Sequence, residues 1–148
     1  MSADVAIRSA TRADTPALAP LLGELGYPVD SAELETRMTR MLARDDEIIL
    51  IAERRGGGPL PALGLLALHV FPVLAYSEDL AMIMALVVAE QARGLGVGRR
   101  LVSSAESLAR ERGASRLMVT THLRRADAHA FYERLGFDFT GRRYLKAL

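Results

Sequence analysis

Three glycines at alternate positions and several arginines are concentrated in residues 91–100, which read QARGLGVGRR. Gly94, Gly96 and Gly98 lie between an apolar run, residues 80–88, and a helical pattern. A glycine-rich turn between a strand and a helix exposes backbone N–H groups at the positive end of the helix dipole. The stretch therefore predicts an anion site, and phosphate is the usual anion in such sites.

The arginines of this stretch favour a ligand but do not name it. Arg93, Arg99 and Arg100 add charge-assisted donors, whereas the alternative interpretation is a tight turn with solvated arginines. A P-loop would need a Gly-Lys pair, which the sequence lacks. The dinucleotide fingerprint would need a third glycine at position 99, where Arg99 stands. A nucleoside triphosphate and a nicotinamide dinucleotide are therefore both disfavoured as the ligand.

Length and composition predict one domain, residues 1–148, with a hydrophobic core. The chain has no cysteine, which excludes disulfides, a thiol nucleophile and cysteine-bound zinc. Its three histidines lack the spacing of metal ligands, so no metal is expected. No apolar run is long enough for a membrane span, and residues 1–14 lack the layout of a signal peptide. A cytoplasmic location is expected.

The charge is divided unevenly along the chain. The net charge of +1 argues against a nucleic-acid partner. Residues 1–90 hold 7 basic and 13 acidic side chains, whereas residues 91–148 hold 12 basic and 5 acidic ones. The second part suits an anionic ligand and the first suits a cationic one, although such asymmetry also arises by chance in small domains.

Hydrophobic periodicity predicts a mixed sheet with helices on its faces. Residues 62–70 follow 47–53 across a glycine-rich turn, which predicts an antiparallel hairpin. Residues 80–88 are apolar throughout, so we expect them to be buried on both faces. A helix then leads to a strand at 116–122, and this βαβ unit should be parallel. The expected strands are 5–10, 47–53, 62–70, 80–88, 116–122, 137–140 and 142–148. One helix should start at 14–16 and stop at Gly26, and a second should start at the capping box of Asp30 and Glu33. A third should run from the glycine turn to Gly113, and a fourth should span 126–136.

Two motifs in this pattern resemble those of the GCN5-related N-acetyltransferase (GNAT) superfamily. Gln91-x-x-Gly94-x-Gly96 matches the acetyl-CoA signature Q/R-x-x-G-x-G/A, and residues 128–137, AHAFYERLGF, resemble the second motif. The resemblance implies an α/β (α+β) GNAT fold, with a mixed, mostly antiparallel sheet of six to seven strands and about four helices. The implied order is β-α-α-β-β-β-α-β-α-β-β.

The resemblance also implies that acetyl-CoA is the co-substrate. Its pyrophosphate would lie on the glycine turn, and its pantetheine arm would pair with the strand before that turn. The implied cofactor-binding residues are Leu86, Val87, Val88, Gln91, Arg93, Gly94, Leu95, Gly96, Val97, Gly98, Arg99, Arg125 and Tyr132. For Arg125, the alternative to binding the CoA phosphates is that its side chain is simply solvated.

Tyr132 occupies the position of the family's usual general acid, which protonates the departing thiolate. The alternative is a core aromatic, because Phe131, Leu135 and Phe137 form an apolar cluster with it.

The general base is less obvious, because Met84 stands where many relatives have a glutamate, and a thioether cannot take a proton. Glu78, His69 and His122 are the candidate bases, since each is expected near a strand end beside the cleft. A histidine at a strand end is more often simply solvated or hydrogen-bonded.

The resemblance predicts direct acetyl transfer from acetyl-CoA to a primary amine of a small molecule, without a metal. Two alternatives stay open. One is a catalytically weak acyl-CoA sensor, which Met84 favours, and the other is a protein or peptide N-acetyltransferase. The loop 71–79 and the segment 27–33 are expected to line the acceptor site in each case. A homodimer is compatible with the family, and neither a nucleic acid nor a membrane is expected as a partner.

Overall fold

The computed structural model describes residues 4–120 and 126–148, which form two compact units, Met1–Met118 and Val119–Leu148. The strands are β1 (Val5–Ser9), β2 (Glu47–Arg54), β3 (Gly64–Phe71), β4 (Asp79–Val88) and β5 (Ala114–Val119). The helices are α1 (Thr15–Leu25), α2 (Ser31–Leu42), α3 (Val97–Glu111) and α4 (Ala126–Arg134), with short 3-10 turns η2 (Arg12–Asp14) and η3 (Glu90–Ala92).

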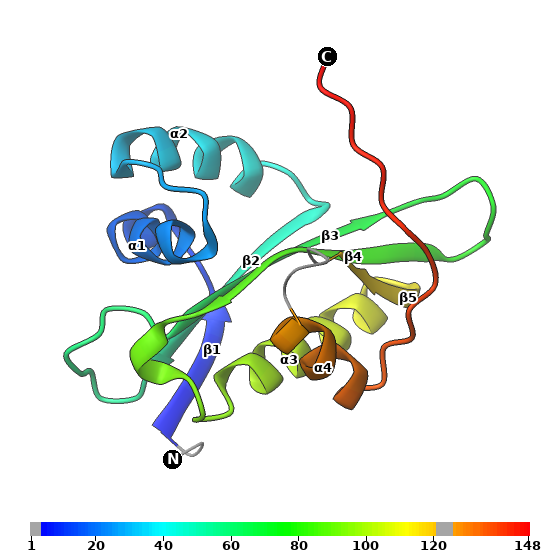
Figure 1. The fold of residues 1–148 in the computed structure, drawn as a ribbon. Helices are drawn as coiled ribbons and strands as arrows, with labels where there is room; N and C mark the ends of the chain where they lie inside the picture. The colour runs from blue at the N-terminus through cyan, green and yellow to red at the C-terminus, as the bar shows by residue number, and fades with distance from the viewer. Residues whose placement is uncertain (1–3, 121–125) are drawn as a thin grey trace. The chain divides into compact units, whose positions relative to one another are not determined.

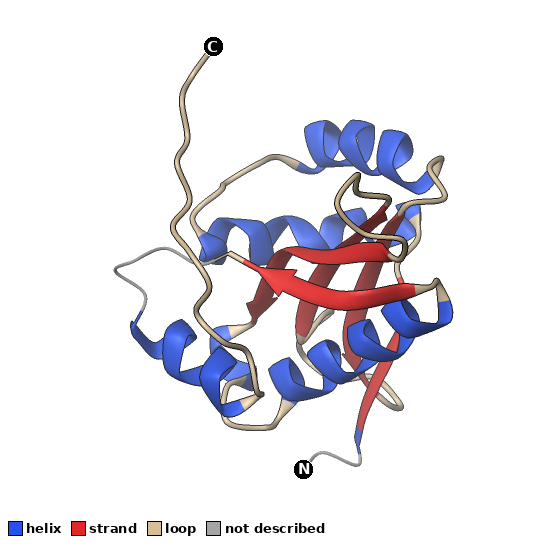
Figure 2. Cartoon of the chain, turned by 90° about the vertical axis from the view of Figure 1, so that its right-hand side faces the viewer, coloured by secondary structure: helices blue, strands red, loops and turns tan. Residues whose placement is uncertain are grey.

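The five strands form one sheet in the order β1-β2-β3-β4-β5. Each neighbouring pair from β1 to β4 is antiparallel, which confirms the expected hairpin between β2 and β3. Helices α1 and α2 lie over one face of these strands and α3 lies over the other (Figure 1). Figure 2 shows the same strands in red from the side. The first unit thus has three layers, and its core lies on both faces of the sheet.

Local sequence signals set the ends of the first two helices. Pro16 lies in the first turn of α1, where its missing N–H costs nothing, and Gly26 ends the helix with φ 105°. Asp30 caps α2, because its side chain accepts a hydrogen bond from the Glu33 N–H at 2.8 Å. These caps fix where the α1–α2 connection begins and ends.

The core consists of aliphatic side chains from the sheet and from the facing helix surfaces. Ile51, Leu66 and Leu68 are fully buried in the central strands, and Leu101 and Val102 are equally buried on α3. Burial of a leucine or isoleucine stabilises the fold by about 1.5–3 kcal/mol relative to exposure. Of the helices that the structure describes, not one combines the length and apolarity needed to cross a bilayer.

The prediction of two further strands, 137–140 and 142–148, is wrong, and so is a sheet of six to seven strands. Among the described residues, 137–148 contain no strand. The segment has aromatic and apolar residues, but a strand forms only where a hydrogen-bonding partner strand is available. The apolar side chains of this segment are exposed: Phe139, Tyr144, Leu145 and Leu148. The observed order, β-α-α-β-β-β-α-β-α, matches the expected one up to α4.

Candidate functional site

The turn after β4 has the geometry of an anion site. Gly94 and Gly96 adopt φ 82° and 78°, and Gly96 is the residue at which α3 begins. The first helical hydrogen bond runs from the Arg100 N–H to the Gly96 carbonyl at 3.1 Å. By helix geometry, the N–H groups of the first three residues of α3 have no partner within the helix. They lie at the positive end of its dipole, as predicted from the glycine spacing.

The space in front of this turn is open. A Cβ atom built on Gly94 or Gly96 would meet no heavy atom within 4 Å. Glycine is therefore needed at these positions for the positive φ and not to allow a tight contact. Arg93 and Arg99 are exposed, and the first turn of α3 has no acidic residue. Gln91 is exposed as well, whereas Leu95 is half-buried. The electrostatics and the free backbone donors therefore both suit a phosphate group.

Close packing against β3 holds this end of α3 in place. Val97 and Leu101 are buried, and both approach Gly64, where a Cβ atom would lie 3.2 Å and 3.1 Å from their methyl groups. The same Cβ would lie 2.9 Å from the Val87 carbonyl oxygen. Only glycine fits here, because every neighbour is tightly placed. Gly64 is a positioning residue that the sequence analysis missed, although a glycine inside a strand pattern signals close backbone approach.

Strand β4 is longer than its neighbour β5. Leu86, Val87 and Val88 pair on one side with β3. On the other side the neighbour is β5, which has 6 residues against the 10 of β4. A strand of that length pairs with only part of β4, so some of this edge is left for another partner.

A β-bulge interrupts β4 in its middle. Ala67 pairs with Ala85 and Leu68 pairs with Ile83, so Met84 is the extra residue. A bulge bends the strand and turns side chains out of register. Met84 is 56% exposed, which contradicts the expectation that 80–88 is buried on both faces. The apolar run does not signal burial here, because the bulge turns Met84 toward solvent.

At the start of β4, the structure brings His69 and Glu47 together. These residues face each other in the β2–β3 register, and His69 Nδ1 lies 2.9 Å from Glu47 Oε1. Nδ1 is also within hydrogen-bond distance, 3.1 Å, of the Asp46 carbonyl oxygen. Burial raises the pKa of the Glu47 carboxyl, and the neighbouring His69 only partly offsets this. Glu47 was not singled out from the sequence, since only the strand register reveals its neighbour.

Glu78 lies apart from that pair, exposed in the β3–β4 loop directly before β4. Two residues earlier, Tyr76 is stacked on Arg116 of β5, with the guanidinium carbon 3.8 Å from the ring centroid. This cation–π contact ties the loop to β5.

The second unit contains Tyr132, on α4. Its ring makes edge contacts with Phe131 and Phe137, with centroids 5.3 Å and 5.6 Å apart. The predicted aromatic cluster is therefore present, and Tyr132 is half-buried within it. The remaining two candidates, His122 and Arg125, lie outside the described residues.

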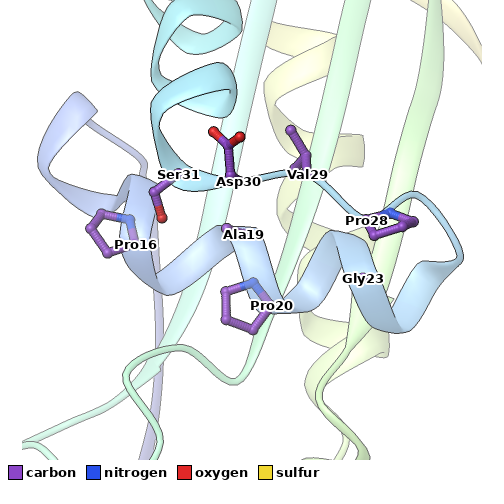
Figure 3. A pocket seen from close by; sticks show the side chains of 8 residues that line it. All are labelled: Pro16, Ala19, Pro20, Gly23, Pro28, Val29, Asp30 and Ser31. Atoms are coloured by element: carbon purple, nitrogen blue, oxygen red, sulfur yellow. The ribbon is translucent and has the colours of Figure 1, made fainter.

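A pocket of about 300 Å³ lies between α1 and the α1–α2 connection (Figure 3). Pro16 and Pro20 line it from α1, and residues 28–31 line it from the connection. Two buried leucines of α1, Leu18 and Leu21, lie on the opposite side of the helix. The pocket therefore opens away from the sheet, and its lining is mostly apolar.

A sequence model of the Acetyltransferase (GNAT) family matches residues 15–137, which include the glycine turn, β4 and α4. This chain belongs to the GNAT acetyltransferase family. It is therefore an acyltransferase, and the glycine turn after β4 lies within the region that the family shares.

Similar proteins agree with this assignment over nearly the whole chain. The aminoalkylphosphonate N-acetyltransferase of Salmonella typhimurium is 31% identical over 143 residues, which cover 96% of this chain and 90% of that enzyme. The crystal structure of a GNAT family acetyltransferase from Staphylococcus aureus has a TM-score of 0.82 at 19% identity, covering 98% and 99% of the two chains. A Trypanosoma brucei acetyltransferase has a TM-score of 0.82 at 22% identity, covering 98% and 100%. These two structures support the fold.

Proposed function

We propose that this GNAT acetyltransferase moves an acetyl group from acetyl-CoA directly to a primary amine of a small molecule. The observation that supports it most is the start of α3, where two left-handed glycines precede N–H groups that have no partner within the helix. The similarity to an aminoalkylphosphonate N-acetyltransferase supports a small amine as the acceptor.

In this proposal the pyrophosphate of acetyl-CoA binds the backbone of residues 93–99, with Arg93 and Arg99 as charged donors. The pantetheine arm pairs with Leu86, Val87 and Val88 and brings the thioester toward the bulge at Met84. From Val88 back to Met84 the strand spans about 13 Å, so the arm must be long and extended. The proposal therefore puts the anion site after the end of β4 and the reaction centre at its middle.

The chemistry is direct transfer, because the chain has no cysteine to form a thioester intermediate. The amine nitrogen attacks the thioester carbon, a C–N bond forms and the C–S bond breaks. We assign Tyr132 as the general acid that protonates the leaving thiolate, which yields free CoA. Glu78, His69 and His122 are the proposed sources of a base.

The test is release of the CoA thiol from acetyl-CoA with a panel of aminoalkylphosphonates, polyamines, aminoglycosides, amino acids and peptides. We expect turnover with one class of small amine. Tyr132→Phe should lower kcat about 100-fold, as loss of a general acid does. Tyr144→Phe is the matched control, because Tyr144 is 89% exposed on the same unit, and it should leave kcat unchanged.

A second candidate function is an acyl-CoA sensor, which the exposed Met84 favours because it places no proton acceptor at the bulge. Calorimetric binding of acetyl-CoA without product from any amine would support the sensor and contradict the enzyme proposal. Turnover of peptides alone would instead support a protein N-acetyltransferase.

A further inference from the structure

The ring of His69 is held in one tautomer by its neighbours. Nδ1 faces the Asp46 carbonyl oxygen at 3.1 Å and Glu47 Oε1 at 2.9 Å. A carbonyl oxygen can only accept a hydrogen bond, so Nδ1 must be the nitrogen that carries the proton. Nε2 of the neutral ring is then the unprotonated nitrogen, with a lone pair available to accept a proton.

Packing also fixes the orientation of the ring. His69 stacks on Phe71, with ring centroids 4.6 Å apart and planes 20° apart. The His69 side chain is 24% exposed, and its Nδ1 edge faces Asp46 and Glu47. Nε2 lies on the ring edge away from these two contacts.

The strand register places this ring beside the interrupted part of β4. His69 pairs with Glu47 on one side and with Met82 on the other, and Met82 lies two residues before the bulge at Met84. Neither methionine can accept a proton from an ammonium group. His69 is thus a titratable side chain on the strand next to the point where the family reaction needs a base.

A metal site is the competing interpretation of this cluster, since Asp46, Glu47 and His69 offer ligand atoms within 4.8 Å of one another. Two contacts oppose it. His69 directs a proton, not a lone pair, at the carboxylates. Arg44 already binds both oxygens of Asp46, at 2.8 Å and 2.6 Å, so a cation would have to displace a guanidinium. Glu47 Oε2 is buried without a hydrogen-bond partner, and the nearest positive charge for that carboxylate is a protonated His69.

We propose that His69 is the general base of the acetyl transfer, acting through Nε2, and that Glu47 is the residue that positions it. This role rests on the proposed function. His69 takes one proton from the acceptor ammonium, directly or through one water, and returns it to solvent after turnover. Tyr132 gives its proton to sulfur as the C–S bond breaks. The nitrogen loses its second proton as the C–N bond forms, and that proton replaces, through solvent, the one that Tyr132 gave. The products are the amide, CoA thiol and one proton released by His69.

Three other charged groups surround the ring among the described residues. The Asp46 carboxylate lies 3.9 Å from Nδ1, Arg44 pairs with Asp46, and Glu47 lies directly against the ring. The two carboxylates both lie on the Nδ1 side of the ring.

The decisive measurement is kcat/KM for the best amine from about pH 6 to 9. With wild type we expect a rise that levels off once His69 is unprotonated. His69→Gln should lower kcat/KM about 100-fold near pH 7 and convert the profile to a continuous rise, because only free amine then reacts. Free imidazole added to His69→Ala should restore part of the rate.

Glu47→Gln tests the positioning role, with Glu53→Gln as the matched control. Glu53 is a carboxylate on the same strand that pairs with Arg8 at 2.9 Å instead. We expect Glu47→Gln to lower kcat about 10-fold and shift the acid limb of the profile, whereas Glu53→Gln leaves the profile unchanged. The ring ¹⁵N chemical shifts of wild type should report the Nδ1–H tautomer of His69.

Three results would overturn the assignment. The first is a His69→Gln profile of wild-type shape, even if lowered overall, which would mean a structural role. The second is an Nε2–H tautomer in wild type. The third is no turnover by wild type with any amine, which would sink the proposed function as well. Wild-type turnover with an unaltered profile in His69→Gln overturns the base alone.

Discussion

The two ends of β4 are built by different physical means. At its far end, the glycine turn and the start of α3 present backbone N–H groups, and the geometry depends on Gly94 and Gly96 at positive φ. At its near end, His69 and Glu47 meet only because β2 and β3 pair in one register. A site made from backbone groups depends on residues that are consecutive in the sequence. A site made from side chains across strands depends on how distant segments align.

The glycine-turn end of β4 depends most on the close packing of α3 against Gly64. We expect Gly64→Ala to disrupt this packing. The new Cβ would lie 2.9 Å from the Val87 carbonyl oxygen, which is backbone and cannot move aside. We expect a loss of about 2–3 kcal/mol in the free energy of unfolding, measured by urea denaturation. Acetyl-CoA binding should weaken too, because α3 starts against this position.

Gly23→Ala is the matched control for that change. Gly23 lies inside α1, where a Cβ would meet nothing within 4 Å. The same methyl group should therefore stabilise the protein by about 0.5–1 kcal/mol. Equal destabilisation by both variants would mean that packing at Gly64 does not set the position of α3.

This contrast also explains what the sequence could predict. The glycine spacing predicted the turn correctly, because a positive φ is a local property of Gly94 and Gly96. Gly26 and Asp30 likewise predicted the helix ends, since caps are local. The pairing of β2 with β3 followed from the glycine-rich turn between them.

The rest required long-range information. Residues 137–148 have enough apolar character for strands, but the sequence does not say whether a partner strand is available. The exposure of Met84 depends on a bulge, which is set by the pairing of β3 with β4. The Glu47–His69 contact joins residues 22 positions apart, and neither residue is unusual in its own segment. The roles of the candidate site residues remain predictions.

Gly96→Ala sharpens the account of the glycine-turn end, with a smaller effect than Gly64→Ala. An alanine at φ 78° is strained but not crowded, because the space in front of Gly96 is open. The strain should cost about 1–2 kcal/mol in stability. Calorimetry should show weaker acetyl-CoA binding, with the pH profile of turnover unchanged. A shifted profile would mean that the two ends of β4 are not independent.

The smallest expected effect concerns two carboxyls whose pKa values move in opposite directions. Burial raises the pKa of Glu47, whereas hydrogen bonds from the Arg8 guanidinium hold the pKa of Asp14 below its ordinary value. A raised folded-state pKa contributes stability below the unfolded pKa of about 4.3 and loses it as the pH rises through the folded value. A lowered folded-state pKa contributes stability above the unfolded pKa of about 3.9, and this stability is lost as the pH falls through the folded value.

Urea denaturation of wild type, Glu47→Gln and Asp14→Asn at several pH values between 3 and 7 separates these contributions. From pH 3 to 7, the stability of wild type relative to Glu47→Gln should fall, and relative to Asp14→Asn it should rise, each by about 1 kcal/mol or less. Opposite slopes would show that Glu47 lowers the stability of the fold at neutral pH. This is the pattern expected of a residue that positions His69 and does not stabilise the fold. Parallel slopes would remove that distinction, because Glu47 would then stabilise the protein as Asp14 does.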